Sequence, residues 1–254
     1  MTDRGLTDGS ERWTLEFARP DGTGGFARLS GNGERSSYWA ALVSPSWGTV
    51  VVHYHGLAAP RHPRLLAVRG DGLWAELVEE TAAEHWSAGL EAFGLRLDDP
   101  LDAEGDGRGE RLPVGFDLEW EVGRGTGGVV HGDLLVARDR VEFEGVGRFA
   151  REVIVPDPGS ESRRVSWRRG PDDGDSASGE AVGVVDDARG LPVAVHVGGR
   201  AFSVSAVVVQ PPVGPPAAGR LVRALVVGEA GCGWLERDQP GAVRRGASRE
   251  DRMR

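Results

Sequence analysis

The sequence contains a single cysteine, Cys232, and no lysine among its 254 residues. One cysteine excludes a disulfide within the chain and any metal cluster built from several thiolates, and it fits a reducing, cytoplasmic setting. Without lysine no Schiff base can form on this chain, and a phosphate-binding loop with its lysine is missing. All 30 basic residues are arginine, which we attribute to coding bias and not to function.

Long apolar runs are also missing. No stretch approaches the length of a membrane-spanning helix, and Met1–Ser10 is polar, so we expect neither an anchor nor a signal peptide. Acidic residues outnumber basic ones by 39 to 30, for a net charge of -9. That charge repels nucleic acid and anionic membrane surfaces. The sequence therefore predicts a partner that is neither nucleic acid nor membrane, and it does not indicate an oligomeric state.

Motifs for cofactors and covalent nucleophiles are incomplete. Gly31-Asn32-Gly33 lacks the further glycine and the helix of a dinucleotide-binding fingerprint. No Gly-x-Ser-x-Gly element is present, and Cys232 lies between two glycines with no histidine beside it. We therefore expect no cofactor and no covalent nucleophile.

Glycine and proline are plentiful, with 39 and 15 residues, and they recur at the short intervals that strands and tight turns require. From Trp13 to Ala18 apolar and polar side chains alternate, as in a half-buried strand. Similar patterns predict strands at Ser37–Val43, Thr49–His55, Leu65–Arg69, Leu73–Val78, His85–Leu97, Val114–Val122, Val129–Ala137, Arg140–Glu144, Phe149–Val155, Val165–Arg168, Ala181–Val185, Val193–Val197, Phe202–Gln210 and Leu221–Val227. Strands this close together pair antiparallel, so the expected fold is all-β.

The glycine run that ends at Gly128 suggests a division of the chain into two β units of similar length. We place the first unit at 11–123 and the second at 127–237. The remaining residues, 238–254, are charged and lack aromatic side chains, which predicts a disordered tail.

His53-Tyr54-His55 is the most suggestive short motif, because side chains two apart on a strand share a face and two imidazoles can bind one metal. A metal site needs further ligands and supporting hydrogen bonds, yet Gly56 and Leu57 follow the motif. Structural histidines are the favoured interpretation, and no metal site is predicted.

Carboxylates share strand faces with aromatic residues in the first half of the chain. Trp74 and Glu76 lie on one face of their strand; a cavity there would desolvate Glu76 and suit it to acid catalysis, whereas an edge strand would turn it to water. His85, Glu91 and Phe93 share a face of the next strand, and the large side chains on its other face predict burial on both sides.

Three carboxylates, Asp117, Glu119 and Glu121, follow one face of a later strand, and Trp120 belongs to the other. We interpret the acidic face as solvated, because burying several like charges close together costs free energy. A catalytic cluster is the alternative. The eight tryptophans of the chain can line an apolar pocket or fill a core, and composition does not separate these two roles.

Several blocks of the first half resemble a known superfamily. The blocks are Asp71–Glu76, Glu84–Trp86, Gly89–Gly94, Leu97–Pro100 and Pro113–Trp120. They look like a bacterial branch of the carotenoid 1,2-hydratase (hydroxyneurosporene synthase)-like superfamily. The resemblance implies two lipocalin-like antiparallel β-barrels or sandwiches in tandem, with ligands in or between them, and an activity on long apolar molecules such as addition of water to isoprenoid double bonds.

The second half resembles this group less. His131-Gly132-Asp133 and Val141–Arg148 are similar to the start of its second unit, but Arg151-Glu152-Val153-Ile154 stands where the group usually has His-Ser-Trp-Gly. The departure removes a patch that the resemblance would make functional.

Our leading hypothesis is a protein that binds a bulky, mainly apolar small molecule and catalyses a cofactor-free hydration, cyclisation or isomerisation on it. Acid catalysis in a dry, aromatic-lined pocket is the physical route. The expected catalytic residues are Glu76, His85, Glu91 and His55. The residues expected to contact the ligand are Trp74, Trp86, Trp120, Tyr54 and Phe93. The alternative is a noncatalytic carrier with the same barrel; docking through exposed strand edges is a third reading.

Overall fold

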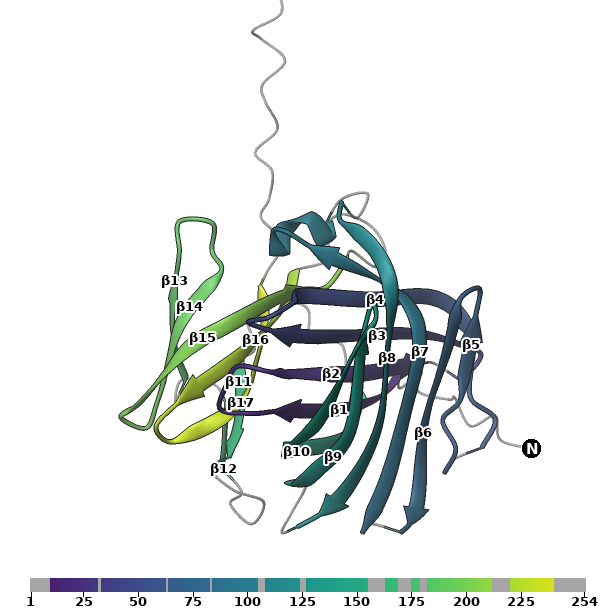
Figure 1. Cartoon of the computed structure of the whole chain (residues 1–254). Coiled ribbons are helices and arrows are strands. Elements are labelled where there is room, and N and C mark those ends of the chain that lie inside the picture. The colour runs from purple at the N-terminus through teal and green to yellow at the C-terminus, as the bar shows by residue number, and fades with distance from the viewer. Residues whose placement is uncertain are drawn as a thin grey trace, which may run out of the picture.

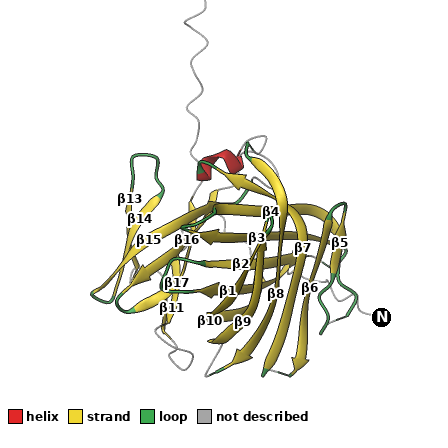
Figure 2. Ribbon diagram, in the orientation of Figure 1, coloured by secondary structure: helices red, strands yellow, loops and turns green. Residues whose placement is uncertain are grey.

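The computed structural model describes residues 10–31, 33–62, 64–82, 84–104, 108–123, 127–154, 163–168, 175–178, 182–211 and 220–239. These residues form two antiparallel sheets. Over the same ranges the single helical element is the short 3-10 helix η1 (Pro100–Glu104) (Figure 2). The all-β prediction is confirmed. Over the same ranges, no helix has the length and apolar character to cross a membrane.

Ten strands form the first sheet, in the order β4-β3-β2-β1-β10-β9-β8-β7-β6-β5 (Figure 1). Their bounds are β1 (Ser10–Ala18), β2 (Gly24–Gly31), β3 (Arg35–Ser44), β4 (Gly48–Ala58), β5 (Val68–Gly70), β6 (Leu73–Thr81), β7 (His85–Leu97), β8 (Glu110–Val122), β9 (Gly127–Val136) and β10 (Asp139–Ile154). The end of β7 also pairs with the start of β4, through Thr49–Leu97, Val50–Arg96 and Val51–Leu95. This pairing closes β1–β4 and β7–β10 into a lipocalin-like barrel, and β5 and β6 extend from it along β7.

Seven strands form the second sheet, in the order β12-β11-β17-β16-β15-β14-β13. They are β11 (Arg163–Arg168), β12 (Asp175–Ser178), β13 (Val182–Asp186), β14 (Pro192–Val197), β15 (Arg200–Val209), β16 (Arg220–Gly228) and β17 (Gly231–Gln239). No pairing between β12 and β13 is present in the described residues, so this sheet is an open half-barrel. The hairpin β13–β14 projects away from the first sheet (Figure 1).

The barrel interior is packed with apolar side chains from alternate positions of its strands. Phe17, Phe116 and Phe143 meet edge to face there, with ring centroids 5.2–6.0 Å apart. Trp86 stacks on Phe149 at 4.2 Å and Trp120 lies 5.5 Å from the same ring. Because the pleat alternates, the neighbouring positions of these strands face outward.

The outside of β1–β4 packs against the second sheet through a separate apolar cluster. Phe26 lies edge to face between Trp39 of the barrel, at 4.6 Å, and Trp234 of β17, at 5.2 Å. Trp39 and Trp234 are both buried. The tryptophans of this contact therefore belong to the joint between the sheets.

Several boundaries differ from expectation. β2 was missed because its glycines hide the strand pattern: a Cβ on Gly25 would lie 2.5 Å from the Phe17 ring, so glycine is required by close packing. β12 lies in a stretch too polar to predict as a strand, and β17 contains Cys232, which was expected in a turn but is buried in the sheet. The two segments predicted around Gly145 are one long strand, β10.

The predicted division of the chain falls at a link inside the first sheet, since β9 and β10 continue it by pairing with β8 and β1. The chain passes from the first sheet to the second between β10 and β11. The division of the chain into two β units therefore stays a prediction. Asp238 and Gln239, placed in the expected tail, end β17, and the tail beyond them lies outside the described residues.

Candidate functional site

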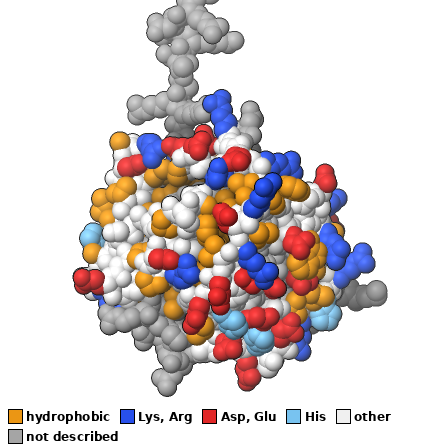
Figure 3. Space-filling view, in the orientation of Figure 1, with side chains coloured by type: hydrophobic (Ala, Val, Ile, Leu, Met, Phe, Trp, Pro, Cys, Tyr) orange, Lys and Arg blue, Asp and Glu red, His pale blue; other side chains and the backbone are white. Residues whose placement is uncertain are grey.

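A hollow of about 920 Å³ lies on the outer face of β6–β9. Figure 3 views the molecule from this side, where hydrophobic side chains alternate with acidic and basic ones. We call this hollow the outer groove. Six of its lining side chains are Trp74, Glu76, Glu91, Phe93, Asp117 and Leu135.

Strand alternation positions these side chains side by side. Trp74 pairs with Glu91 across β6 and β7, and Glu91 in turn is opposite Gly115 of β8. Glu76 is opposite Gly89, and a Cβ on Gly89 would lie 2.8 Å from the Trp74 ring. Trp74 therefore lies against the bare backbone of β7, and the glycine allows an aromatic wall in the outer groove.

Apolar and acidic groups meet in the outer groove. Phe93 is 51% exposed and Leu135 is 39% exposed, although both are large apolar residues. Glu76 is half-buried and Glu91 is exposed, and neither carboxylate has an ion pair or hydrogen bond within the described ranges. Asp133 differs, because it pairs with Arg140 at 2.5 Å. The free carboxylates can therefore accept hydrogen bonds from a ligand or stabilise positive charge on it.

Two further predicted residues lie at the rim of the outer groove. His85 shares the outward face of β7, and its Nε2 lies 2.6 Å from the Glu119 carboxylate. The Tyr54 hydroxyl donates a hydrogen bond to the main-chain oxygen of Asp71 at 3.0 Å, beside the turn at Gly72 that lines the groove. The structure thus gathers Glu76, His85, Glu91, Trp74, Phe93 and Tyr54 in or beside the outer groove.

Three predicted residues lie elsewhere. Trp86 and Trp120 point into the barrel and pack on Phe149, on the opposite side of the sheet from the outer groove. His55 is exposed on β4 in edge-to-face contact with His53 at 3.9 Å. Burial, with a smaller contribution from His55, lowers the pKa of His53 to about 3, so this imidazole is neutral at ordinary pH.

The solvated interpretation of the acidic face of β8 agrees with the structure, because Asp117 and Glu121 are exposed while Trp120 is buried. The expectation that β7 is buried on both faces is wrong, since Glu91 and Phe93 are exposed. A large aromatic side chain can form the wall of a surface groove as well as part of a core. The alternation pattern alone does not distinguish these two positions.

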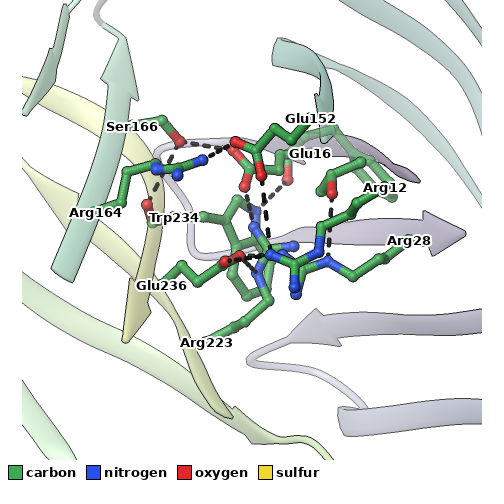
Figure 4. Close-up of polar contacts among 11 residues, drawn as sticks. Arg12, Glu16, Arg28, Glu152, Arg164, Ser166, Arg223, Trp234 and Glu236 are labelled. Carbon is green, nitrogen blue, oxygen red and sulfur yellow. Dashed lines mark hydrogen bonds and ion pairs between the residues drawn. The ribbon is translucent and has the colours of Figure 1, made fainter. Parts of the chain in front are cut away.

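A second constellation joins the two sheets and was not anticipated. We call it the junction network, and it consists of Arg12, Glu16, Arg28, Glu152, Arg164, Ser166, Arg223 and Glu236 (Figure 4). Glu16 accepts hydrogen bonds from Arg223 and, at 2.7 Å, from the Ser166 hydroxyl. Glu236 accepts hydrogen bonds from Arg28 and, at 3.4 Å, from Arg12.

The centre of the junction network is deeply buried, and Arg164 and Glu152 lie at its partly exposed edge. The Arg223 side chain is 0% exposed and lies 4.3 Å over the Phe26 ring. Burial lowers the pKa of Arg223 to about 10, against the opposing effect of Glu16. Burial acts to raise the pKa of Glu236, but Arg28, Arg223 and Arg12 together hold it well below its usual range. The carboxylate of Glu236 therefore stays ionised far into the acid range.

Sequence reasoning passed over the junction network because its members are far apart in the chain. Glu16 and Arg223 are separated by 207 positions. One signal was present: Arg223 interrupts the apolar run Leu221–Val227. An arginine inside an otherwise apolar strand predicts a buried charge with a partner.

Comparison with known proteins gives solved structures of low similarity. No protein-family model matches the sequence. No curated protein matches it. Kievitone hydratase from Nectria haematococca superposes with a TM-score of 0.49 at 12% identity, over 92% of each chain. A candidate AttH protein from Nitrosomonas europaea gives a TM-score of 0.45 at 15% identity, over 91% of this chain and 92% of that one.

Proposed function

We propose that the outer groove binds a bulky, mainly apolar small molecule of the isoprenoid, polyene or polyketide kind. The observation that carries the proposal is the hollow of about 920 Å³, in which Phe93 and Leu135 are exposed to solvent beside the half-buried Trp74. Sites for small molecules occupy roughly 300–1,000 Å³ and combine apolar walls with a few polar groups. Exposed apolar side chains that gather in one hollow mark a binding surface more often than scattered ones do.

The carboxylates determine which charge is favoured on the polar end of a ligand. Glu76, Glu91 and Asp117 lie beside the aromatic wall, Arg140 is engaged by Asp133, and Arg111 places one guanidinium 5.3 Å over the Phe93 ring, so carboxylates outnumber the cations that Asp133 does not engage. Negative potential in a groove repels anions and attracts cations or hydrogen-bond donors. The ligand therefore has an apolar body for Trp74 and Phe93 and a neutral or positive polar end.

Binding is tested with two related dyes, neutral N-phenyl-1-naphthylamine and anionic 1-anilinonaphthalene-8-sulfonate. We expect the neutral dye to bind with enhanced fluorescence and the anionic dye to bind at least ten-fold more weakly. Trp74→Ala should weaken the neutral dye, whereas Val193→Ala, at an apolar side chain 48% exposed on β14, should not. Equal loss in both variants, or no binding of either dye, contradicts the proposal.

The finer proposal is a cofactor-free hydration, cyclisation or isomerisation, with Glu76 as the acid. In a hydration, Glu76 protonates an alkene carbon, water adds to the resulting cation, and the proton lost by that water returns to Glu76. Trp74 contributes an aromatic face that stabilises the cation. The superfamily resemblance of the first-half motifs supports this chemistry.

Turnover is tested by mass spectrometry of polyene and terpenoid compounds incubated with the protein, searching for the mass of one added water or for an isomer. Glu76→Gln should abolish turnover and leave binding of the neutral dye intact. Turnover that survives Glu76→Gln contradicts the assignment of the acid.

A noncatalytic carrier is the second candidate, and one observation favours it. Glu91 is exposed and Glu76 is half-buried, whereas an acid tuned for catalysis needs a drier site. A ligand recovered unchanged after prolonged incubation, with tight binding lost in Trp74→Ala, assigns the carrier function.

A further inference from the structure

Two neighbouring rows of residues cross the outer groove from β6 to β9. The first row has a large apolar side chain at each end and consists of Trp74, Glu91, Gly115 and Leu135. The second row is acidic and consists of Glu76, Gly89, Asp117 and Asp133. Since neighbouring strands are spaced by roughly 4.8 Å, each row is about 14 Å long. The outer groove can therefore hold an elongated molecule along the first row, with its polar group facing the second.

Two carboxylates lie on either side of an open position at the centre of these rows. On β7 and β8, Glu91 is opposite Gly115. The next outward pair along these strands is Gly89 and Asp117, so Glu91 and Asp117 are diagonal neighbours, roughly 7–8 Å apart at their Cα atoms. The Trp74 ring covers Gly89, whereas Gly115 adds no side chain between the two carboxylates. A single cation above Gly115 can therefore contact both of them.

Carboxylates outnumber guanidinium groups in the lining of the outer groove. Among the residues that the structure describes, the acidic members of this lining are Glu76, Glu91, Asp117 and Asp133. One arginine, Arg140, belongs to the same lining, and Asp133, with a smaller effect of Asp117, raises its pKa. Arg111 adds a second guanidinium at the edge, over the Phe93 ring. Four carboxylates against two guanidinium groups leave an excess of two negative charges.

The residues next to this lining do not reverse the sign of the charge. Arg69 is opposite Trp74 on β5, but Asp71 lies close by in the turn that follows β5. Glu119 continues the acidic face of β8 and is paired with His85 at 2.6 Å. A hollow with a negative potential attracts cations and repels anions.

Building on the small-molecule site proposed above, we propose that the ligand of the outer groove is an amphiphilic amine, protonated at neutral pH. Its apolar body lies along the first row, between Trp74 and Leu135 and beside Phe93. Its ammonium group lies above Gly115 and donates hydrogen bonds to Glu91 and Asp117. Hydrogen bonds between charged partners are stronger than neutral ones, and the face of a tryptophan also attracts a cation.

The test is competition against the neutral dye N-phenyl-1-naphthylamine by decylamine, decan-1-ol and decanoate, which share one alkyl chain and differ in charge. We expect decylamine to displace the dye at a concentration about ten-fold lower than decan-1-ol, and decanoate to be the weakest. High salt should reduce the advantage of decylamine, because the screening length falls to ~3 Å at 1 M.

Two substitutions that keep the size of the side chain locate the charge. Glu91→Gln and Asp117→Asn should each reduce the advantage of decylamine over decan-1-ol, and the double variant should remove it. The affinity for decan-1-ol should not change. Glu121→Gln is the matched control, because Glu121 is exposed on the same face of β8 but lies outside the lining. It is about 13 Å from Asp117 along the strand, beyond the screening length of ~8 Å in physiological salt, so the advantage should persist.

The outcomes separate this proposal from the one on which it rests. Equal displacement by the three compounds, or an advantage of decylamine that survives in the double variant, overturns the amine and leaves the small-molecule site standing. Failure of both decylamine and decan-1-ol to displace the dye overturns both proposals.

Discussion

The outer groove and the junction network are built from the same ingredients, aromatic rings and carboxylates on β-strands, yet they differ in access to water. In the junction network, Glu16 and Glu236 are enclosed by arginines and by the second sheet. In the outer groove, Glu76 and Glu91 have no such partners among the described residues, and Phe93 is open to solvent. Carboxylates that are already hydrogen-bonded to arginines stabilise the joint between the sheets. Carboxylates without such partners, beside exposed rings, are available to a ligand.

The sharpest contrast is between Glu236 of the junction network and Glu91 of the outer groove. Glu236→Gln leaves Arg28 buried without its counter-ion and leaves Arg223 with Glu16 alone, so we expect the free energy of unfolding to fall by roughly 3–5 kcal/mol. Glu91→Gln should change it by less than about 0.5 kcal/mol, because the side chain is exposed. Urea unfolding of both variants checks this. Similar losses at the two positions would break the comparison.

A hydroxyl in each region provides a smaller contrast. Ser166 donates to buried Glu16 at 2.7 Å, and Ser87 donates to Glu80 at 2.9 Å on the surface. We expect Ser166→Ala to cost about 1.5–3 kcal/mol, the usual range for a hydrogen bond to a charged group. Ser87→Ala should cost less than about 0.5 kcal/mol. Chemical denaturation at neutral pH measures both, and a larger cost at Ser87 would contradict the assignment of the buried region.

The pH dependence of stability tests whether burial on the outside of the barrel is as complete as at the junction. The pKa of His53 falls from 6.5 to about 3 on folding. Between these values the unfolded chain binds a proton that the folded chain refuses, so stability falls as the pH drops below 6.5. The slope from this group is up to ~1.4 kcal/mol per pH unit. His53→Gln should flatten the stability profile between pH 6 and 5; an unchanged profile would mean that water reaches His53.

The smallest expected effect concerns the wall of the outer groove. Gly89→Ala places a methyl group against the Trp74 ring, and the half-buried ring can tilt away, so we expect a loss of about 1 kcal/mol. The same variant should weaken the binding of the neutral dye. Gly183→Ala is the matched control, since its nearest neighbour, the Cβ of His196, would lie 3.6 Å away, an ordinary contact. Dye binding that is insensitive to Gly89→Ala would remove Trp74 from the site.

Local alternation was enough to predict much of the outer groove. The period of two placed Trp74 beside Glu76 and separated Asp117 from Trp120, because these relations depend only on neighbours in one strand. It could not decide which face of β7 points inward, since Trp86 and Phe93 are both large. Pairing with the rest of the barrel made that choice, which placed Trp86 inside and Phe93 outside.

The junction network was beyond local reasoning for a different physical reason. Glu16 follows the polar side of an alternating strand, and such a position normally faces water. Here that side is covered by β17, a strand from the far end of the chain that was itself not predicted. Only Arg223 carried a usable signal, because its own strand is otherwise apolar.

The closure of the barrel has a consequence for its motions. Twelve residue pairs join β7 to β8, but only three join β7 to β4. A ring of strands opens first where its ladder is shortest, so the seam at Thr49–Val51 is the place where the backbone amides should exchange with solvent soonest. The short pairing between β4 and β7 is thus the weakest point of the barrel wall. Its opening would expose the apolar interior without separating the two sheets.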